Sequence, residues 1–543
     1  MADPKDLLLT IAEMVESRRQ NFDTTYQDIV DLVRPNTQDF NRTSNPGEVR
    51  TPCAYDGTAI NACLELASGL HSYLTNPSER FFTLGVMGMS PDQYDEEALA
   101  WLEIVSESIY AVYGKEESGF NTALHECYLD IGAFGTSCPY QYYSQELGSV
   151  RFRAFAIADV YFREDSDGRI DHVARRILWN KRQIAQEFGE AAVPTKIAQN
   201  KQEEREYTVW HLVCPRKDRV YGKQDAGNKK FASYYVCEDT KEMISEGGYD
   251  ELPYSPGRWF TFANEIYGVG PARNCLPEIR MLNVMERTLI KASQKRADPP
   301  IQVTDEGFMD PIETAPGSLI YRESGVEPAE LLQFTGDIQW SVEHAEQKRN
   351  YIRKCFYFDW LKMEKENKEM TAFEVADRRN EKLQLLAPNA SRIQGEQLSP
   401  MIRRTYNLLH QRGYFPPAPP SLIRDPVTGA RRRLMVAYIS PAARAQMAIK
   451  ANEMGRYVQE ITPLIQIYPD IIDAVDFDKL AKKLADYRQV TRVILRTDEQ
   501  IAARRAEKQQ QQQMAQMAQI AEPASKALKN VADAQAKGLE LGL

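Results

Sequence analysis

Residues that could do chemistry are spread along this chain and form no recognised catalytic motif. The eight cysteines contain no CxxC pair, which predicts buried free thiols instead of a zinc site or a disulfide framework. The six histidines are also dispersed, and an isolated histidine is more often a solvated or core residue than a metal ligand. We therefore expect no metal site, no cofactor and no catalytic residue.

Phosphate-binding and hydrolytic signatures are also missing from the sequence. It contains no GxxxxGK[ST], HExxH or GxSxG. Gly268-Val269-Gly270 lacks the third glycine of a dinucleotide fingerprint and leads into Pro271, which is typical of a loop. The sequence thus predicts a protein that is not an enzyme.

Positively charged side chains in two segments could instead contact the phosphates of DNA. They are Arg287, Lys291, Lys295, Lys362, Lys365 and Lys368, which we take as DNA-channel candidates. The first three could equally be a solvated face with cations favourably placed near a helix C-terminus. The last three could be ion-paired at i,i+4 with neighbouring glutamates. A surface that passes close to phosphates is the other interpretation, and the sequence leaves both open.

The composition limits what kind of nucleic-acid contact is possible. A chain of 543 residues with 43% hydrophobic residues is long enough for several subdomains with sizeable cores. Its net charge of −10 disfavours tight wrapping of nucleic acid, although it would let DNA slide past. No apolar run approaches the ~18 residues of a membrane span, and the N-terminus has no basic leader, so no membrane or secretory signal is expected.

A predicted helix over residues 277–297 must position the first three cations. Its apolar residues recur at three-and-four spacing from Ile279 to Ala292, which places them on one face. Pro277 suits a first helical turn, and Asp298-Pro299-Pro300 prevents continuation. Its apolar stripe should pack against a second helix or a neighbouring subunit. The subunit-packing candidates are Leu282, Met285, Leu289 and Trp340.

A compact insert and a second helix follow. Residues 301–336 contain two strand-like runs, 301–303 and 318–322, among many prolines and glycines. Residues 337–356 are predicted to be helical, with Val342 on the apolar face and Arg349 interrupting that face. Two helices joined through a tight insert should pair antiparallel, and each would be roughly 30 Å long at about 1.5 Å per residue.

The rest of the chain indicates an α+β fold that is predominantly helical. Residues 1–138 read as helices, and residues 139–262 as short alternating strands with one inserted helix near residues 181–188. A long helix is expected from about residue 371, with a kink at Pro400. A strand-like run at 434–440 precedes a helical C-terminal region, whose Gln-rich end could be a disordered tail or a long helix.

Three separated stretches resemble one known family. They are YDGTAINACLELASGLHSYLTNPSERFF, YGVGPARNCLPEIRMLNVMERTLIKASQKRADPPIQV and MTAFEVADRRNEKLQLLAPNASRIQGEQLSPMIRRTYNLLHQRGYFP. No single motif is diagnostic, but their order along residues 20–415 is specific. The chain resembles the head-to-tail connector, or portal, proteins of short-tailed, podovirus-type bacteriophages.

That resemblance implies a ring, usually a dodecamer, at one capsid vertex, through which double-stranded DNA is packaged and later ejected. It implies these segments in chain order: a helical wing region (residues 1–138), a β-rich wing subdomain (139–270), a first stem helix (271–300), a clip (301–336), a second stem helix (337–356), a channel loop (357–370), a long wing helix with its return (371–435), and a helical crown or barrel (436–543). The clip would dock the motor and tail. Its candidate residues are Asp305, Glu306, Phe308, Asp310, Glu313, Arg322 and Glu323.

The resemblance also implies partners and a location. The partners would be a separate large terminase ATPase, a tail adaptor protein, and the major capsid and scaffolding proteins, with no membrane. The protein would reside in the virion and in the host cytoplasm during assembly. Two alternatives remain at this point: another structural protein of the virion, such as a tail or internal core component, or a DNA-processing enzyme with an unrecognised active site.

Overall fold

The computed structural model describes most of the chain. The described residues are 3–35, 37–42, 54–89, 94–200, 202–220, 222–223, 225–263, 265–297, 299–302, 330–331, 338–358, 386–423, 434–439, 441–468, 475–488 and 500–511. They form two compact units. The first comprises residues 1–82, 107–415 and 436–440, and the second comprises residues 83–106, 416–435 and 441–543. The mixture of helices and strands confirms an α+β fold.

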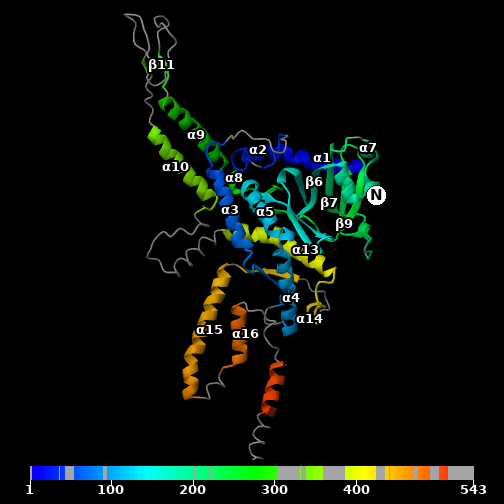
Figure 1. Ribbon diagram of the computed structural model, residues 1–543, viewed down its shortest axis with the longest axis vertical. Helices are drawn as coiled ribbons and strands as arrows, with labels where there is room; N and C mark the ends of the chain where they lie inside the picture. Colours follow the sequence, from blue (N-terminus) through cyan, green and yellow to red (C-terminus); the bar gives the residue numbers. More distant parts are fainter. Residues whose placement is uncertain are drawn as a thin grey trace, which may run out of the picture. The chain divides into compact units, whose positions relative to one another are not determined.

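A five-stranded antiparallel sheet is the centre of the first unit's β-rich region, and its strands follow chain order (Figure 1). They are β5 (Val160–Glu164), β6 (Ile170–Asn180), β7 (Glu206–Pro215), β8 (Phe231–Cys237) and β9 (Met243–Tyr249). Two smaller antiparallel pairs accompany it: β3 (Pro139–Ser144) with β4 (Ser149–Ala154), and β2 (Thr136–Ser137) with β10 (Gly257–Arg258). The strand-rich prediction for residues 139–262 is confirmed.

Alternation along the strands gives the large sheet two buried faces. Trp210 and Leu212 of β7 point to one face, where they pack with Ile11 of α1 (Pro4–Asn21). Val209, one residue away, points to the other face and packs with Ile184 of α6 (Lys181–Phe188). Because side chains of a strand alternate between faces, both sides can be apolar only when helices cover both. The helix predicted within the strand-rich segment is the one that covers the second face, beside the short α7 (Thr195–Ala198).

Helices form the remainder of the first unit's body. They are α2 (Asp23–Leu32), α3 (Thr58–Leu74), α5 (Phe120–Phe134) and α13 (Ser399–His410), with the C-terminal half of α4 (Glu96–Tyr113). Tyr26, Phe134 and Tyr267 form an aromatic cluster where α2 and α5 meet the β-rich region. This aromatic cluster packs α2 and α5 against the β-rich region.

The Gly268-Val269-Gly270 segment is a loop, as predicted, and its glycines have a structural reason. Gly135 follows α5 with φ +74°, and a Cβ on it would lie 2.2 Å from the backbone nitrogen of Gly270. A Cβ on Gly268 would lie 2.1 Å from the carbonyl oxygen of Gly135. Two backbones cross here with no room for side chains, so the glycines serve this crossing.

The helix pair predicted between residues 277 and 356 is present. It consists of α9 (Leu276–Ala297), preceded by the short α8 (Pro271–Asn274), and α10 (Ile338–Cys355). The two long helices are in contact with each other, and Figure 1 shows them side by side. Strands β11 (Ile301–Gln302) and β12 (Glu330–Leu331) pair antiparallel between them. The predicted strand at 318–322 lies outside the described residues.

The helix predicted beyond residue 371 is described from residue 386 onward. It is α-helical over 386–393, changes to a π-helical turn (Gln394–Leu398), and continues as α13. Pro400 lies in the first turn of α13, directly after the π turn, and its missing N–H removes one i→i−4 hydrogen bond at this point of the helix. The irregularity predicted at Pro400 thus takes the form of a π turn immediately before it.

The second unit is mostly helical where it is described. It includes the N-terminal half of α4, α14 (Pro420–Ile423), α15 (Pro441–Ile467) and α16 (Phe477–Tyr487), and residues 500–511 are also helical. The Trp101 indole N–H donates to the Pro416 carbonyl at 2.9 Å within this unit. Strands β1 (Phe82–Val86) and β13 (Leu434–Tyr438) lie where the chain passes between the units. The helical prediction after residue 441 is confirmed for these residues.

Candidate functional site

The α9/α10 pair is the region of the described chain that presents the predicted cations. Ile279 and Leu282 of α9, Ala345 and Ile352 of α10, and Phe356 directly after α10 are buried. Contacts to α3 and α8 hold α10 at its C-terminal end. Because these apolar side chains are buried, the opposite faces of both helices point outward.

Arg349, predicted only as an interruption of the α10 apolar face, joins three acidic residues. Its Nε donates to Asp56 at 2.9 Å, its Nη1 donates to Glu346 at 3.1 Å, and its Nη2 pairs with Glu286 of α9. Burial raises the pKa of Asp56, but hydrogen bonds from Thr58 and Arg349 outweigh it, so this pKa is lowered. Asp56 lies 293 residues away in the sequence, which is why the periodicity of α10 alone could not reveal this role.

Both acidic residues of α9 are engaged by α10. Glu286 pairs with Arg349, and Glu278 accepts from Lys348 at 2.7 Å. The outward face of α9 therefore carries positively charged side chains, while both glutamates of this helix pair with α10. Arg287, Lys291 and Lys295 are exposed on it at i,i+4 spacing, and the Arg287 guanidinium lies 5.9 Å from the Tyr55 ring. This row is a candidate surface for phosphates.

Two apolar side chains share the outward face with the cations. Val284 is 63% exposed and Met281 is 44% exposed, about two to three turns before Lys291. Sequence reasoning missed both, although their spacing from Ile279 and Leu282 already places them off the apolar stripe. Large apolar groups clustered on a face with no internal partner mark a candidate protein contact.

The other candidates fall into three groups. Leu282 is 2% exposed and packs within its own chain, while Met285 and Leu289 are half-buried beside it. Val342 is 49% exposed, so its predicted place in the apolar face is wrong, because the buried face of α10 centres on Ala345 and Ile352. The remaining candidates lie outside the described residues, or have side chains outside them: Trp340, Lys362, Lys365, Lys368, Asp305, Glu306, Phe308, Asp310, Glu313, Arg322 and Glu323.

A buried arginine anchors the π turn to the β-rich region. Arg258 of β10 donates from Nε and Nη2 to the Glu396 carboxylate at 2.9 and 3.0 Å, and pairs through Nη1 with Glu164. Its Nη2 also donates to the Gly168 carbonyl at 3.0 Å. The Arg258 side chain is 7% exposed. Planar, bidentate pairing of this kind fixes geometry as well as charge, so it sets the direction in which the chain enters the π turn.

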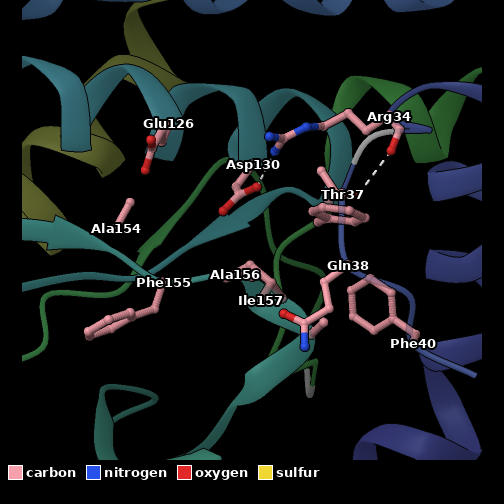
Figure 2. A pocket seen from close by; sticks show the side chains of 12 residues that line it. Arg34, Thr37, Gln38, Phe40, Glu126, Asp130, Ala154, Phe155, Ala156 and Ile157 are labelled. Carbon is pink, nitrogen blue, oxygen red and sulfur yellow. Dashed lines mark hydrogen bonds and ion pairs between the residues drawn. The ribbon is translucent and has the colours of Figure 1, made fainter. Parts of the chain in front are cut away.

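A cavity of about 210 Å³ lies between the segment after α2, helix α5 and the end of β4. Figure 2 shows Arg34 reaching toward Asp130, with Glu126 one turn away on the same helix. Burial raises the pKa of Asp130 to about 7, even though the Arg34 charge acts in the opposite direction. The cavity contains one cation and two carboxylates beside apolar walls, which include Phe40 and Phe155.

Asp130 should make stability fall as the pH rises. Its folded pKa of about 7 lies above its ordinary value of 3.8. Its stabilising effect is therefore fully present below pH 3.8 and is lost as the pH rises from there through about 7, a change of about 2–4 kcal/mol. We expect Asp130→Asn to reduce the difference in Tm between pH 5 and pH 8. The check is thermal unfolding of both proteins across this range.

Arg34→Gln is the matched variant for this prediction. It removes the charge that lowers the pKa of Asp130, so the midpoint of the stability change should move above pH 7. Identical pH profiles for the unmodified protein and Asp130→Asn would show that this carboxyl does not titrate in the range.

The residues that the structure describes contain neither a metal-binding cluster nor a membrane-spanning helix. They contain no group of three or more histidine, cysteine, aspartate or glutamate side chains placed to hold a metal ion. Among the same residues, none of the helices is both long and apolar enough to cross a membrane.

Comparison with known proteins decides the family. The family model described as "Bacteriophage head to tail connecting protein" matches residues 5–495. The chain belongs to this family. The family is structural and not enzymatic, so the expectation that the chain is not an enzyme is confirmed. Such connector proteins are virion components at the junction of head and tail.

Two curated relatives cover nearly the whole chain. The "Probable portal protein" of Bordetella phage BPP-1 is 28% identical over 520 residues, which is 93% of this chain and 91% of the relative. The "Portal protein" of Salmonella phage epsilon15 is 26% identical over 525 residues, again 93% of this chain and 91% of the relative. The resemblance inferred from the three sequence stretches is thereby confirmed.

Proposed function

We propose that this protein is a portal: a ring at one capsid vertex that forms the channel for packaging and ejection of double-stranded DNA. The observation that carries the proposal is the family match over residues 5–495, together with two portal relatives that each align with 93% of the chain. We propose a dodecamer, located in the virion and in the host cytoplasm during assembly.

The helix pair supports the assignment of segments. In this proposal α9 and α10 are the stem, residues 301–336 are the clip, and residues 357–370 are the channel loop. The body is the wing, with residues 1–138 and 371–435 as its helical regions and 139–270 as its β-rich subdomain, and residues 436–543 form the crown. The stem helices are braced by Arg349 and Lys348, which cross-link them through ion pairs. Such bracing suits two helices that must keep one relative position in every subunit.

The outward face of α9 would serve two partners along its length. Its N-terminal half carries Met281 and Val284, which are suited to contact the next subunit, because a ring needs a heterologous interface that closes on itself. Its C-terminal half carries Lys291 and Lys295, which are suited to DNA phosphates. In a protein with a net charge of −10 a few cations would give weak, salt-sensitive and sequence-independent contact. DNA could then move without sticking.

The remaining partners follow from the proposed segments. The clip would dock a separate large terminase ATPase during packaging and a tail adaptor protein afterwards. The wing would meet the major capsid and scaffolding proteins. The sequence contains no GxxxxGK[ST], which agrees with a motor ATPase carried on another chain.

The position of the protein in the virion tests this proposal. Gold labelling of an affinity tag on the chain should mark one vertex of each particle, at the head-tail junction. Label distributed along the tail, or inside the head, would assign the protein to another structural role. An untagged virion preparation processed in parallel measures background binding of the gold.

The predicted channel loop gives a functional prediction. Lys362→Glu, Lys365→Glu and Lys368→Glu combined should leave assembly intact but reduce packaged DNA, because the replacements turn a weak attraction for phosphate into repulsion. We expect roughly a tenfold or greater loss of DNA-filled heads, measured by nuclease-protected DNA per particle. The three lysine-to-arginine changes keep the charge and should retain packaging. A normal DNA content in the glutamate variant would place these lysines away from DNA.

A further inference from the structure

Two cysteines that are far apart in the sequence meet at the base of the α9/α10 pair. Cys275 lies between α8 and α9 and is buried, whereas Cys355 ends α10 and is partly exposed. Helices α8 and α10 are in contact there. The two thiols interact closely enough that each shifts the pKa of the other, and the Cys275 Sγ–H donates to the Pro271 carbonyl oxygen at 3.2 Å. Both thiols are free.

The surroundings give the two thiols different reactivity. Interactions with Cys275 and Tyr351 lower the pKa of Cys355 to about 7, against the effects of burial and of Glu278. The interaction with Cys355, together with burial, raises the pKa of Cys275. Cys355 is therefore the better nucleophile near neutral pH, since the thiolate is the attacking species. Cys275 keeps its proton until its neighbour has reacted.

Other cysteines of the described chain lack this combination. Cys63 and Cys127 are buried and have pKa values raised by burial, that of Cys63 to about 12. Cys214 is partly exposed, but burial raises its pKa to about 11. A partly exposed thiolate beside a second thiol is the arrangement of redox-active cysteine pairs.

We propose that Cys275 and Cys355 are a redox-active dithiol that forms an intrachain disulfide by exchange with a low-molecular-weight disulfide such as oxidised glutathione. The Cys355 thiolate attacks one sulfur of glutathione disulfide and expels one glutathione thiolate, which leaves a mixed disulfide on Cys355. The Cys275 sulfur then attacks the Cys355 sulfur, loses its proton, and expels the second glutathione. The protein gives up two electrons and two protons, and one glutathione disulfide becomes two glutathione molecules.

The disulfide would tie the start of α9 to the end of α10. It would close a loop that contains both helices and the insert between them, and so restrict their separation at the base. The dithiol form would persist in a glutathione-rich, reducing compartment, and the disulfide would form outside it. This site depends only on the contact between α8 and α10, so it does not rest on ring formation or on DNA.

Mass spectrometry can test the pair on the full-length protein. The protein would be equilibrated with graded ratios of reduced to oxidised glutathione, quenched with an alkylating reagent and digested with trypsin. We expect residues 274–280 to appear cross-linked to residues 355–362 under oxidising conditions, and dithiothreitol to reverse the link. Thiols counted after denaturation should fall by two from the eight of the reduced chain.

Single variants separate the two roles. Cys275→Ser should accumulate a glutathione adduct at Cys355 that does not resolve, and Cys355→Ser should form neither adduct nor cross-link. Cys214→Ser is the matched control and should behave like the unmodified protein. The proposal is overturned if no cross-linked peptide forms in excess oxidised glutathione, or if the Cys355 adduct persists while Cys275 is present.

Discussion

Met281→Asp combined with Val284→Asp is expected to abolish ring assembly while leaving the subunit folded. Both side chains are largely exposed on the outward face of α9, at 44% and 63%, so the isolated subunit loses little internal packing. In a ring each would be buried against the next subunit, where an unpaired carboxylate costs several kcal/mol. A loss of that size at every interface weakens association by more than about a hundredfold. Analytical ultracentrifugation would measure the distribution of oligomers.

Leu9→Asp is the matched control for that variant. Leu9 is a helical residue of comparable exposure, 62%, on α1, and its replacement should leave assembly unchanged. Circular dichroism should show the same helix content and a similar Tm in all three proteins. Rings of normal size from the Met281/Val284 variant would mean that this half of α9 does not face a neighbouring subunit.

Arg258→Met should cause a large loss of stability. The change leaves the carboxylates of Glu164 and Glu396, which are 20% and 28% exposed, without their shared cation. Removing one partner of a buried ion pair costs about 3–5 kcal/mol. We expect a fall in Tm of roughly 5–10 °C, and earlier proteolytic cleavage near the π turn, because the Arg258–Glu396 pair helps to hold this turn to β10.

Two variants bracket that prediction. Arg163→Met removes an exposed arginine that lies 3.7 Å from Glu13 and should cost less than about 1 kcal/mol. Arg258→Lys keeps the charge but cannot make the bidentate pair, so its Tm should lie between those of the unmodified protein and Arg258→Met. A Tm for Arg258→Met equal to that of Arg163→Met would contradict the anchoring role.

Local sequence signals predicted the elements whose ends they mark. The prolines at 277 and 299–300 bound α9, and the alternating runs between 139 and 262 became strands. The cation row of α9 could also be predicted, because Arg287, Lys291 and Lys295 recur at helical spacing. These features need no information about distant regions of the chain, which is why periodicity was sufficient.

Features made by distant residues could not be predicted in this way. Arg258 pairs with Glu164 and Glu396, which are 94 and 138 residues away. In the sequence Arg349 only interrupts an apolar face, whereas in the structure it pairs with Asp56. Cys275 and Cys355 appeared as two isolated thiols because nothing in their local sequence brings α8 to the end of α10. Charged or reactive residues inside apolar patterns are the signal that could have marked such sites.

Electron microscopy of the purified protein tests the central claim most directly. Class averages should show annular particles with a central hole, and a symmetry-resolved reconstruction should place Met281 and Val284 of α9 against the next subunit, with Lys291 and Lys295 toward the channel. A protein that remains strictly monomeric under all assembly conditions would contradict the proposal that it forms a portal ring.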